Sequence, residues 1–191
     1  PAPSAYASVV LQGQPASYWT LNETSGTTAY DYAGGLDGTF PVPPGVVLGV
    51  NGPRPPAQAG FDASNNAYQL DGATGWVTAP ALNWNTNTVT FTAWVKLSAY
   101  DDDLSGVLFT RGDSASGIHI VSTGELRYHW DGGFWSWNSG LVVPDGEWAH
   151  IAMVVEPNRT TLYLNGTPAV NNGNHQMQPF EADFFLGADP N

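Results

Sequence analysis

The stretch VTFTAWVKL, residues 89–97, alternates apolar and polar side chains with a period of two. Phe91, Ala93, Val95 and Leu97 share one face, and the threonines, Trp94 and the lysine share the other. Successive side chains on a strand point to opposite sides, so this pattern is typical of a β-strand with one buried face.

Short segments of the same kind lie on both sides of this stretch, separated by turn residues. They predict strands at 6–11, 16–21, 67–70, 76–78, 107–110, 117–121, 125–130, 134–137, 148–155, 160–164, 167–170 and 184–187. Asn165-Gly166 is a strong signal for a tight hairpin turn, and the Pro- and Gly-rich stretch 41–66 is expected to be a long surface loop. We expect Trp94 and Trp148 to be buried. With 22 Gly and 15 Pro among 191 residues, the chain reads as all-β: one two-sheet antiparallel jelly-roll sandwich over 1–191, with residues 1–5 as a linker.

Charge and composition exclude several function classes. The 17 acidic and 5 basic residues give a formal charge of −12, which argues against binding to nucleic acid or to anionic membrane surfaces. No apolar run approaches the roughly 20 residues of a membrane helix, so no membrane insertion is expected. The chain has no cysteine, which excludes disulfides and thiolate metal sites.

Five segments together resemble a known family. They are SYWTLNETSG (17–26, followed by Asp31 and Gly34-Gly35), LDGATGWV (70–77), FTAWVK (91–96), GEWAHIA (146–152) and LYLNG (162–166). In this order they resemble the bacterial laminin-G-like domains of the concanavalin A-like lectin/glucanase superfamily, over about residues 6–189. The resemblance implies a concanavalin A-like jelly roll and is far more specific for fold than for function, because one fold hosts many activities.

The resemblance also implies a further strand after the segment LGAD (186–189), whereas this chain ends at Asn191. Three alternatives explain the missing strand. The sequence is truncated, residues 6–11 close the sheet edge, or another copy of the chain supplies the strand. The last would make the protein an oligomer through its C-terminal edge strand.

A structural Ca²⁺ is the cofactor that the resemblance implies. Carried over to this sequence, its ligands would be the side chains of Glu23 and Asp31 with carbonyl groups around Gly34 and Gly35. The alternative is that these are solvated turn residues. A second acidic cluster, Asp101-Asp102-Asp103, is more typical of a solvated loop than of a metal site.

Aromatic residues crowd one predicted hairpin. They are Tyr128, Trp130, Phe134, Trp135 and Trp137. A sandwich needs aromatic residues in its core, but a hairpin with one solvated side cannot bury all of them. We therefore expect some of this set to form an exposed platform for sugar rings, whose C–H faces pack on aromatic rings.

Catalytic patterns are absent from the sequence. No glutamate lies in the acidic E-x-D-x-E run that related jelly-roll glycoside hydrolases carry, and no phosphate loop or nucleophile elbow is present. The sequence therefore predicts no enzyme. It predicts a recognition module for a glycan or glycoprotein, carried on a larger secreted bacterial protein outside the cell or on its surface. The alternatives are a structural or adhesive domain, such as a filament or surface-layer subunit, and a divergent glycanase.

Overall fold

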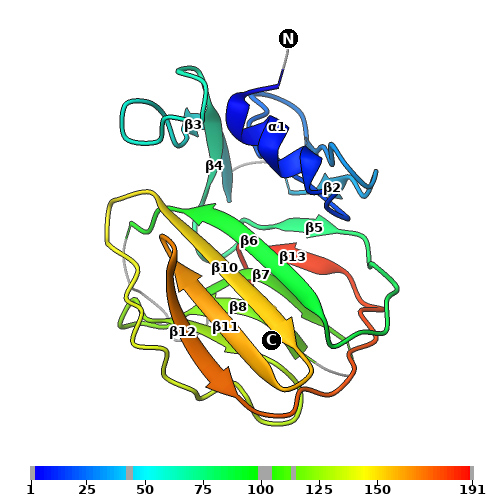
Figure 1. Cartoon of the computed structure of the whole chain (residues 1–191). Coiled ribbons are helices and arrows are strands. Elements are labelled where there is room, and N and C mark those ends of the chain that lie inside the picture. The colour runs from blue at the N-terminus through cyan, green and yellow to red at the C-terminus, as the bar shows by residue number, and fades with distance from the viewer. Residues whose placement is uncertain (1–2, 42–44, 99–104, 113–114, 190–191) are drawn as a thin grey trace. The chain divides into compact units, whose positions relative to one another are not determined.

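The computed structural model describes residues 3–41, 45–98, 105–112 and 115–189. It divides into two compact units, residues 1–80 and 81–191 (Figure 1). The described residues form a single helix and thirteen short strands, which confirms the all-β class with antiparallel sheets. No helix among them is long and apolar enough to cross a membrane. One domain over 1–191 stays a prediction.

The first unit combines a helix with short strands. The elements are α1 (Ala5–Gln12), β1 (Thr28–Ala29), β2 (Gly38–Thr39), β3 (Val46–Asn51), β4 (Asn66–Leu70) and β5 (Val77–Ala79). Strands β1, β2 and β5 pair antiparallel in that order, and β3 pairs with β4 as a separate hairpin. Strand β3 lies within the stretch 41–66, where only a loop was expected.

Helix α1 occupies the segment 6–11, for which the sequence wrongly predicted a strand. The Ser4 hydroxyl accepts the Ala7 N–H at 3.1 Å and caps the helix, and the N–H of Gly13 closes its other end. The pair Val9-Val10 favours a strand, but local capping by Ser4 overrides that weak preference. Tyr6 anchors the helix by stacking on Phe61, with ring centroids 4.3 Å apart.

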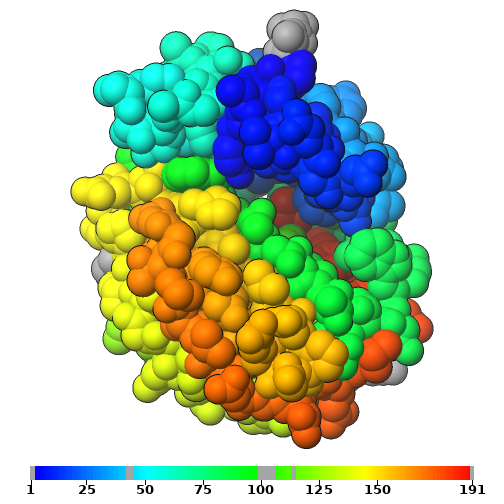
Figure 2. Space-filling view, viewed as in Figure 1, coloured from blue at the N-terminus to red at the C-terminus, as the bar shows by residue number. Residues whose placement is uncertain are grey.

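The second unit is a sandwich of two antiparallel layers. Its strands are β6 (Val89–Val95), β7 (Ser105–Arg111), β8 (Ala115–Ile120), β9 (Leu126–His129), β10 (Ala149–Glu156), β11 (Arg159–Leu164), β12 (Thr167–Asn172) and β13 (Phe184–Leu186). One layer has the order β12-β11-β10-β6, and β13-β7-β8-β9 lie behind it (Figure 1). Figure 2 shows the outward surface of the first layer, where side chains pack closely from β12 to β6.

Alternation along the strands divides core from surface as the sequence predicted. Phe91 on β6 faces the interior opposite Met153 of β10, and its ring meets that of Phe184 on β13 at 5.7 Å. Trp94 faces the other way, pairs with His150 and is half-buried, so the prediction that it is buried was wrong. Trp148 is likewise half-buried, because it lies in the turn before β10.

The predicted second strand of the aromatic hairpin, residues 134–137, does not form. The chain instead turns at residues 131–133 and continues as a loop to residue 141. Gly132 and Gly133 have positive φ angles of 101° and 110°, and the Phe134 N–H donates to the Trp130 carbonyl at 3.4 Å across this turn, after which no strand begins. The aromatic side chains of this loop are therefore placed individually rather than by strand alternation.

Candidate functional site

A buried histidine joins the two layers of the second unit and fixes the aromatic loop. His175 Nε2 lies 3.0 Å from the Tyr128 hydroxyl on β9 and 2.9 Å from the Thr160 hydroxyl on β11. Asn171 Nδ2 on β12 donates to the same tyrosine oxygen at 2.9 Å. Burial lowers the pKa of His175, which favours the neutral imidazole between these groups.

The structure separates the five aromatic residues that the sequence grouped. Tyr128 and Trp130 are fully buried, and the Trp130 indole N–H donates to the Gln176 carbonyl at 2.8 Å. Phe134 stacks on His175 at 4.3 Å, and Trp137 contacts the Tyr128 ring edge-on. Trp135 alone of the five is exposed, with 53% of its surface accessible.

Trp135 extends a row of aromatic rings across the outer face of the layer β13-β7-β8-β9. The register places Phe109 on β7, Gly117 on β8 and His129 on β9 side by side. Because Gly117 has no side chain, the Phe109 and His129 rings meet across it at 5.7 Å, nearly perpendicular. Trp135 packs against His129 in turn, at 5.5 Å. Phe109 is fully buried, so the row runs from a buried floor to an exposed indole.

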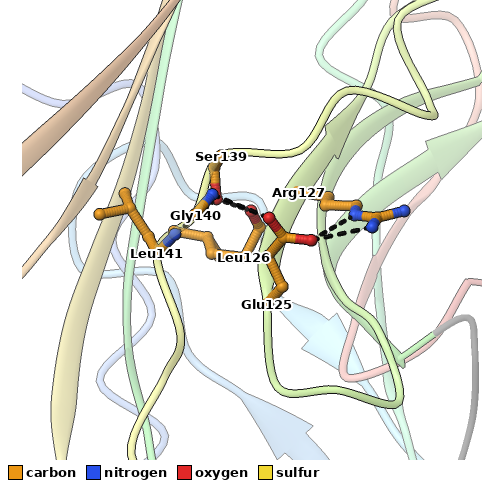
Figure 3. A network of polar contacts seen from close by, with 6 residues as sticks. All are labelled: Glu125, Leu126, Arg127, Ser139, Gly140 and Leu141. Carbon is orange, nitrogen blue, oxygen red and sulfur yellow. Dashed lines mark hydrogen bonds and ion pairs between the residues drawn. The ribbon is translucent and has the colours of Figure 1, made fainter.

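Charged side chains flank this row. Arg127, two residues before His129 on the same face of β9, donates through Nε and a terminal nitrogen to Glu125 Oε2 at 3.0 and 2.8 Å (Figure 3). The other Glu125 oxygen accepts the Gly140 N–H at 2.8 Å, and the Ser139 hydroxyl donates to the Leu126 carbonyl. This network ties the end of the aromatic loop to β9.

A second ion pair lies at the other end of the row. The Arg111 guanidinium donates to both oxygens of Asp189 at 2.5 and 2.9 Å and lies over the Phe109 ring. Both arginines of this face are thus neutralised by carboxylates within the protein. The face presents polar groups around an aromatic platform rather than a field of positive charge.

His119 on β8 completes the face. Its side chain is 4% exposed, and burial together with neighbouring His129 lowers its pKa to about 4. The imidazole is therefore neutral over the physiological range. Sequence reasoning missed His129, Glu125 and Arg127 as site residues, although the alternation of residues 125–129, with Leu126 and Tyr128 inward, would have put them together on the outward face.

The residues predicted to bind calcium lie in the first unit, where Asp31 has a different role. Its carboxylate accepts the N–H groups of Tyr18, Ala33, Gly34 and Leu36 at 2.7 to 3.1 Å. These four bonds lower the pKa of Asp31 against the opposing effect of burial. A carboxylate offers about four lone-pair sites, so all of them are occupied.

Glu23 is also engaged. Its Oε1 accepts the Tyr30 N–H at 3.2 Å and its Oε2 accepts the Tyr68 hydroxyl at 2.6 Å. Gly34 and Gly35 are exposed. Within the described residues no group of three His, Asp or Glu side chains could hold a metal ion, and Asp101-Asp102-Asp103 lies outside them. Calcium binding by Glu23, Asp31 and the carbonyl groups around Gly34 and Gly35 stays a prediction.

Replacing Asp31 by Asn tests which role the carboxylate has. The amide offers one acceptor oxygen, so we expect a loss of about 1–3 kcal/mol in the free energy of unfolding, equal with calcium or with chelator. Differential scanning calorimetry measures it. A wild-type melting temperature that rises with calcium, and no longer rises in Asp31→Asn, would instead establish an ion at this loop.

The glycine in the aromatic row gives a second prediction. A Cβ atom at Gly117 would lie 2.3 Å from the Leu108 carbonyl oxygen and 2.7 Å from the Phe109 ring. Gly117→Ala should lower the free energy of unfolding by about 1–3 kcal/mol in urea denaturation. The control is Gly112→Ala, whose new Cβ would meet the Ala182 side chain at 3.2 Å and no backbone atom of the described residues at closer range. Equal effects of the two variants would contradict the packing described for the row.

The buried imidazole of His119 predicts that the stability of the protein depends on pH. The folded-state pKa of His119 is about 4, below the ordinary value of 6.5, so the unfolded chain binds a proton that the folded chain excludes. Stability from this residue is complete above 6.5 and is lost as the pH falls toward 4. We expect the urea midpoint to decrease less between about pH 7 and about pH 4 in His119→Asn than in the wild type. Parallel decreases in the two proteins would contradict the assignment.

Several solved structures have a fold similar to that of this chain. Domain 4 of AbnA, a GH43 extracellular arabinanase from Geobacillus stearothermophilus solved with arabinotriose, is 19% identical and superposes with a TM-score of 0.50 over 65% of this chain and 63% of that one. Trypanosoma rangeli sialidase in complex with sialic acid is 13% identical, with a TM-score of 0.60 over 91% of this chain and 27% of the sialidase. A mutant of that sialidase that displays trans-sialidase activity is 14% identical, with a TM-score of 0.61 over 93% of this chain and 28% of the mutant.

This chain thus spans less than two thirds of each of these structures. At these identities the likeness shows the fold alone. No curated protein sequence matches the chain. A family model for the concanavalin A-like lectin/glucanases superfamily, of the laminin-G type, matches residues 71–191. That match covers more than half of the chain and confirms the resemblance read from the sequence motifs: the protein belongs to the concanavalin A-like lectin/glucanases superfamily.

Proposed function

We propose that the protein is a non-catalytic carbohydrate-recognition module whose ligand lies on the outer face formed by β7, β8 and β9. One observation carries the proposal: Trp135 is more than half exposed while its ring is held against His129. An indole fixed in this way loses little conformational entropy when a sugar ring packs on it.

Polar groups beside the indole suit the hydroxyls of a sugar. Arg127 lies on β9 with His129 and Glu125 immediately precedes that strand, and each is partly accessible, with 24% and 12% of the side chain exposed. Carboxylates accept, guanidinium groups donate, and a neutral imidazole does both, so the face offers the mixed donors and acceptors that carbohydrate hydroxyls require. The module would take a neutral glycan, because both arginines of the face are already paired.

A catalytic role has less support than recognition. Hydrolysis of a glycosidic bond needs two carboxyl groups placed on either side of it. On this face Glu125 is bound to Arg127 and the Gly140 amide, and Asp189 is bound to Arg111 and almost fully buried. We therefore propose binding without turnover. The arabinotriose bound by the arabinanase domain and the sialic acid bound by the sialidase guide the choice of test ligands.

Location and partners follow as part of the same proposal. A glycan or a glycoprotein is the partner, and the module belongs to a larger secreted protein that acts outside the cell or at its surface. Self-association through the C-terminal edge strand stays a prediction, and no particular contact among the described residues favours it.

Trp135→Ala tests the proposal. Loss of the ring should weaken binding by about tenfold, or about 1.4 kcal/mol, while the melting temperature stays unchanged. Binding is measured by glycan array and then by titration calorimetry, with a panel that contains arabinotriose, cellotriose and sialyl-lactose. Trp84→Ala is the matched control, since Trp84 is also exposed, at 45%, and makes none of the ring contacts that join Phe109, His129 and Trp135.

Two further variants complete this experiment. Trp130→Ala and Trp137→Ala should lower stability, because the first indole is buried with its N–H bonded and the second packs on Tyr128. A Trp135→Ala protein that binds the panel as the wild type does would refute the proposed site.

A further inference from the structure

A pair of exposed tyrosines stands in the first unit, where the calcium ligands were expected. Tyr30 and Tyr32 are 51% and 54% exposed. Asp31 between them turns inward to its four amide donors and forms an isolated bridge with Trp19. Both phenol groups lie close enough to Tyr68 to raise the pKa of its hydroxyl, and that hydroxyl donates to Glu23, so the two rings share the surface around Glu23.

The backbone that carries these rings is fixed at every residue. The Tyr30 N–H donates to Glu23 Oε1 at 3.2 Å, the Asp31 N–H to Asp37 Oδ1 at 2.8 Å, and the Tyr32 N–H to the Tyr18 carbonyl at 2.9 Å. Most exposed aromatic side chains in loops are mobile, whereas these two stand on a segment with no free amide. Such preorganisation lowers the entropic cost of binding a ligand on the rings.

A polar group lies beside the pair. Tyr68 on β4 donates its hydroxyl to Glu23 Oε2 at 2.6 Å, and Phe40 packs against the Tyr68 ring at 5.1 Å. Burial first, then Glu23, raises the pKa of Tyr68, with smaller contributions from Tyr32 and Tyr30. Each Glu23 oxygen has accepted one hydrogen bond and can accept another. Glu23 can thus receive hydroxyl groups from a ligand on the tyrosine pair.

We infer that Tyr30, Tyr32 and Glu23 form a second carbohydrate-binding site, specific for neutral oligosaccharides. Two exposed rings that are neighbours on one surface suit two units of one chain rather than a single sugar. Glu23, Asp31 and Asp37 make this surface acidic and disfavour glycans with carboxylate or sulfate groups. The site uses none of the residues of the Trp135 face, so each of the two sites can be tested independently of the other.

The test starts from the Trp135→Ala chain, in which the first site is removed. We expect this protein to retain binding to a neutral glycan of an array that carries both neutral and sialylated oligosaccharides. Adding Tyr30→Ala and Tyr32→Ala together should weaken that binding by about tenfold or more. The pair Tyr30→Phe and Tyr32→Phe keeps the rings and should stay within about threefold, since stacking is the main contribution.

Controls separate binding from folding. Tyr163→Ala, at a half-buried tyrosine on β11 of the other unit, is the tyrosine control for binding and should bind as its parent does. Melting temperatures of the Tyr30 and Tyr32 variants should agree with those of their parents, because neither exposed ring supports the core. Loss of all neutral-glycan binding in Trp135→Ala, or unchanged binding after the two Tyr→Ala changes, would overturn the inference, and binding of sialylated glycans alone would overturn the ligand class.

Those outcomes also distinguish the two sites. If the Trp135→Ala chain binds as the wild type does while Tyr30→Ala with Tyr32→Ala abolishes binding in the wild-type background, the proposed Trp135 site fails and the tyrosine site stands. The reverse pattern removes the tyrosine site and leaves the Trp135 site in place.

Discussion

The hydrogen bonds of His175 hold the two layers of the second unit in register. Nε2 lies within hydrogen-bonding distance of Tyr128 on one layer and Thr160 on the other. A polar group in a core is costly unless it is bonded, so these contacts admit one relative placement of the layers. The same imidazole stacks on Phe134, which fixes the loop immediately before Trp135. The exposed indole is thus positioned from inside the sandwich.

This constraint explains why the aromatic residues fall into two roles. Tyr128, Trp130 and Phe134 surround His175 and shield it from water, whereas Trp135 is left to pack on the outside of β9. Gly117 makes the outer arrangement feasible, because only a residue without a side chain lets the rings of Phe109 and His129 meet across β8. The core and the Trp135 platform therefore lie on opposite sides of the same strands. A single substitution in the core can move Trp135 even when the substituted residue does not contact it.

Much of the fold could be predicted from the sequence, because its strands follow simple periodicity. Residues 89–97 alternate over a long stretch, and Asn165-Gly166, with φ angles of 48° and 84°, forms the tight turn between β11 and β12 that its type predicts. Residues 6–11 could not be read in the same way. Ser4 caps the helix through one hydrogen bond, and the two neighbouring valines carry little information against it.

The candidate site was predicted less well than the fold. The sequence pointed to the aromatic cluster but assumed a second strand at 134–137, and strand alternation would have put Trp135 and Trp137 on one side. In the loop they diverge, because their positions depend on His129, Tyr128 and His175, which come from distant parts of the chain. Likewise, no local pattern shows that the Asp31 carboxylate is occupied by four amides. The spacing of residues along the sequence does not predict tertiary contacts of this kind.

The most direct test of the account is a titration of the chain labelled with nitrogen-15, followed through the indole N–H signals of its eight tryptophans. The ligand is the oligosaccharide that binds most tightly in the array, and Trp135→Phe assigns the signal of interest. The account predicts that the Trp135 signal shifts with saturation, while the signals of the buried Trp130 and of the exposed control residue Trp84 stay in place. A saturable shift of Trp84 with an unmoved Trp135 signal would contradict the central claim.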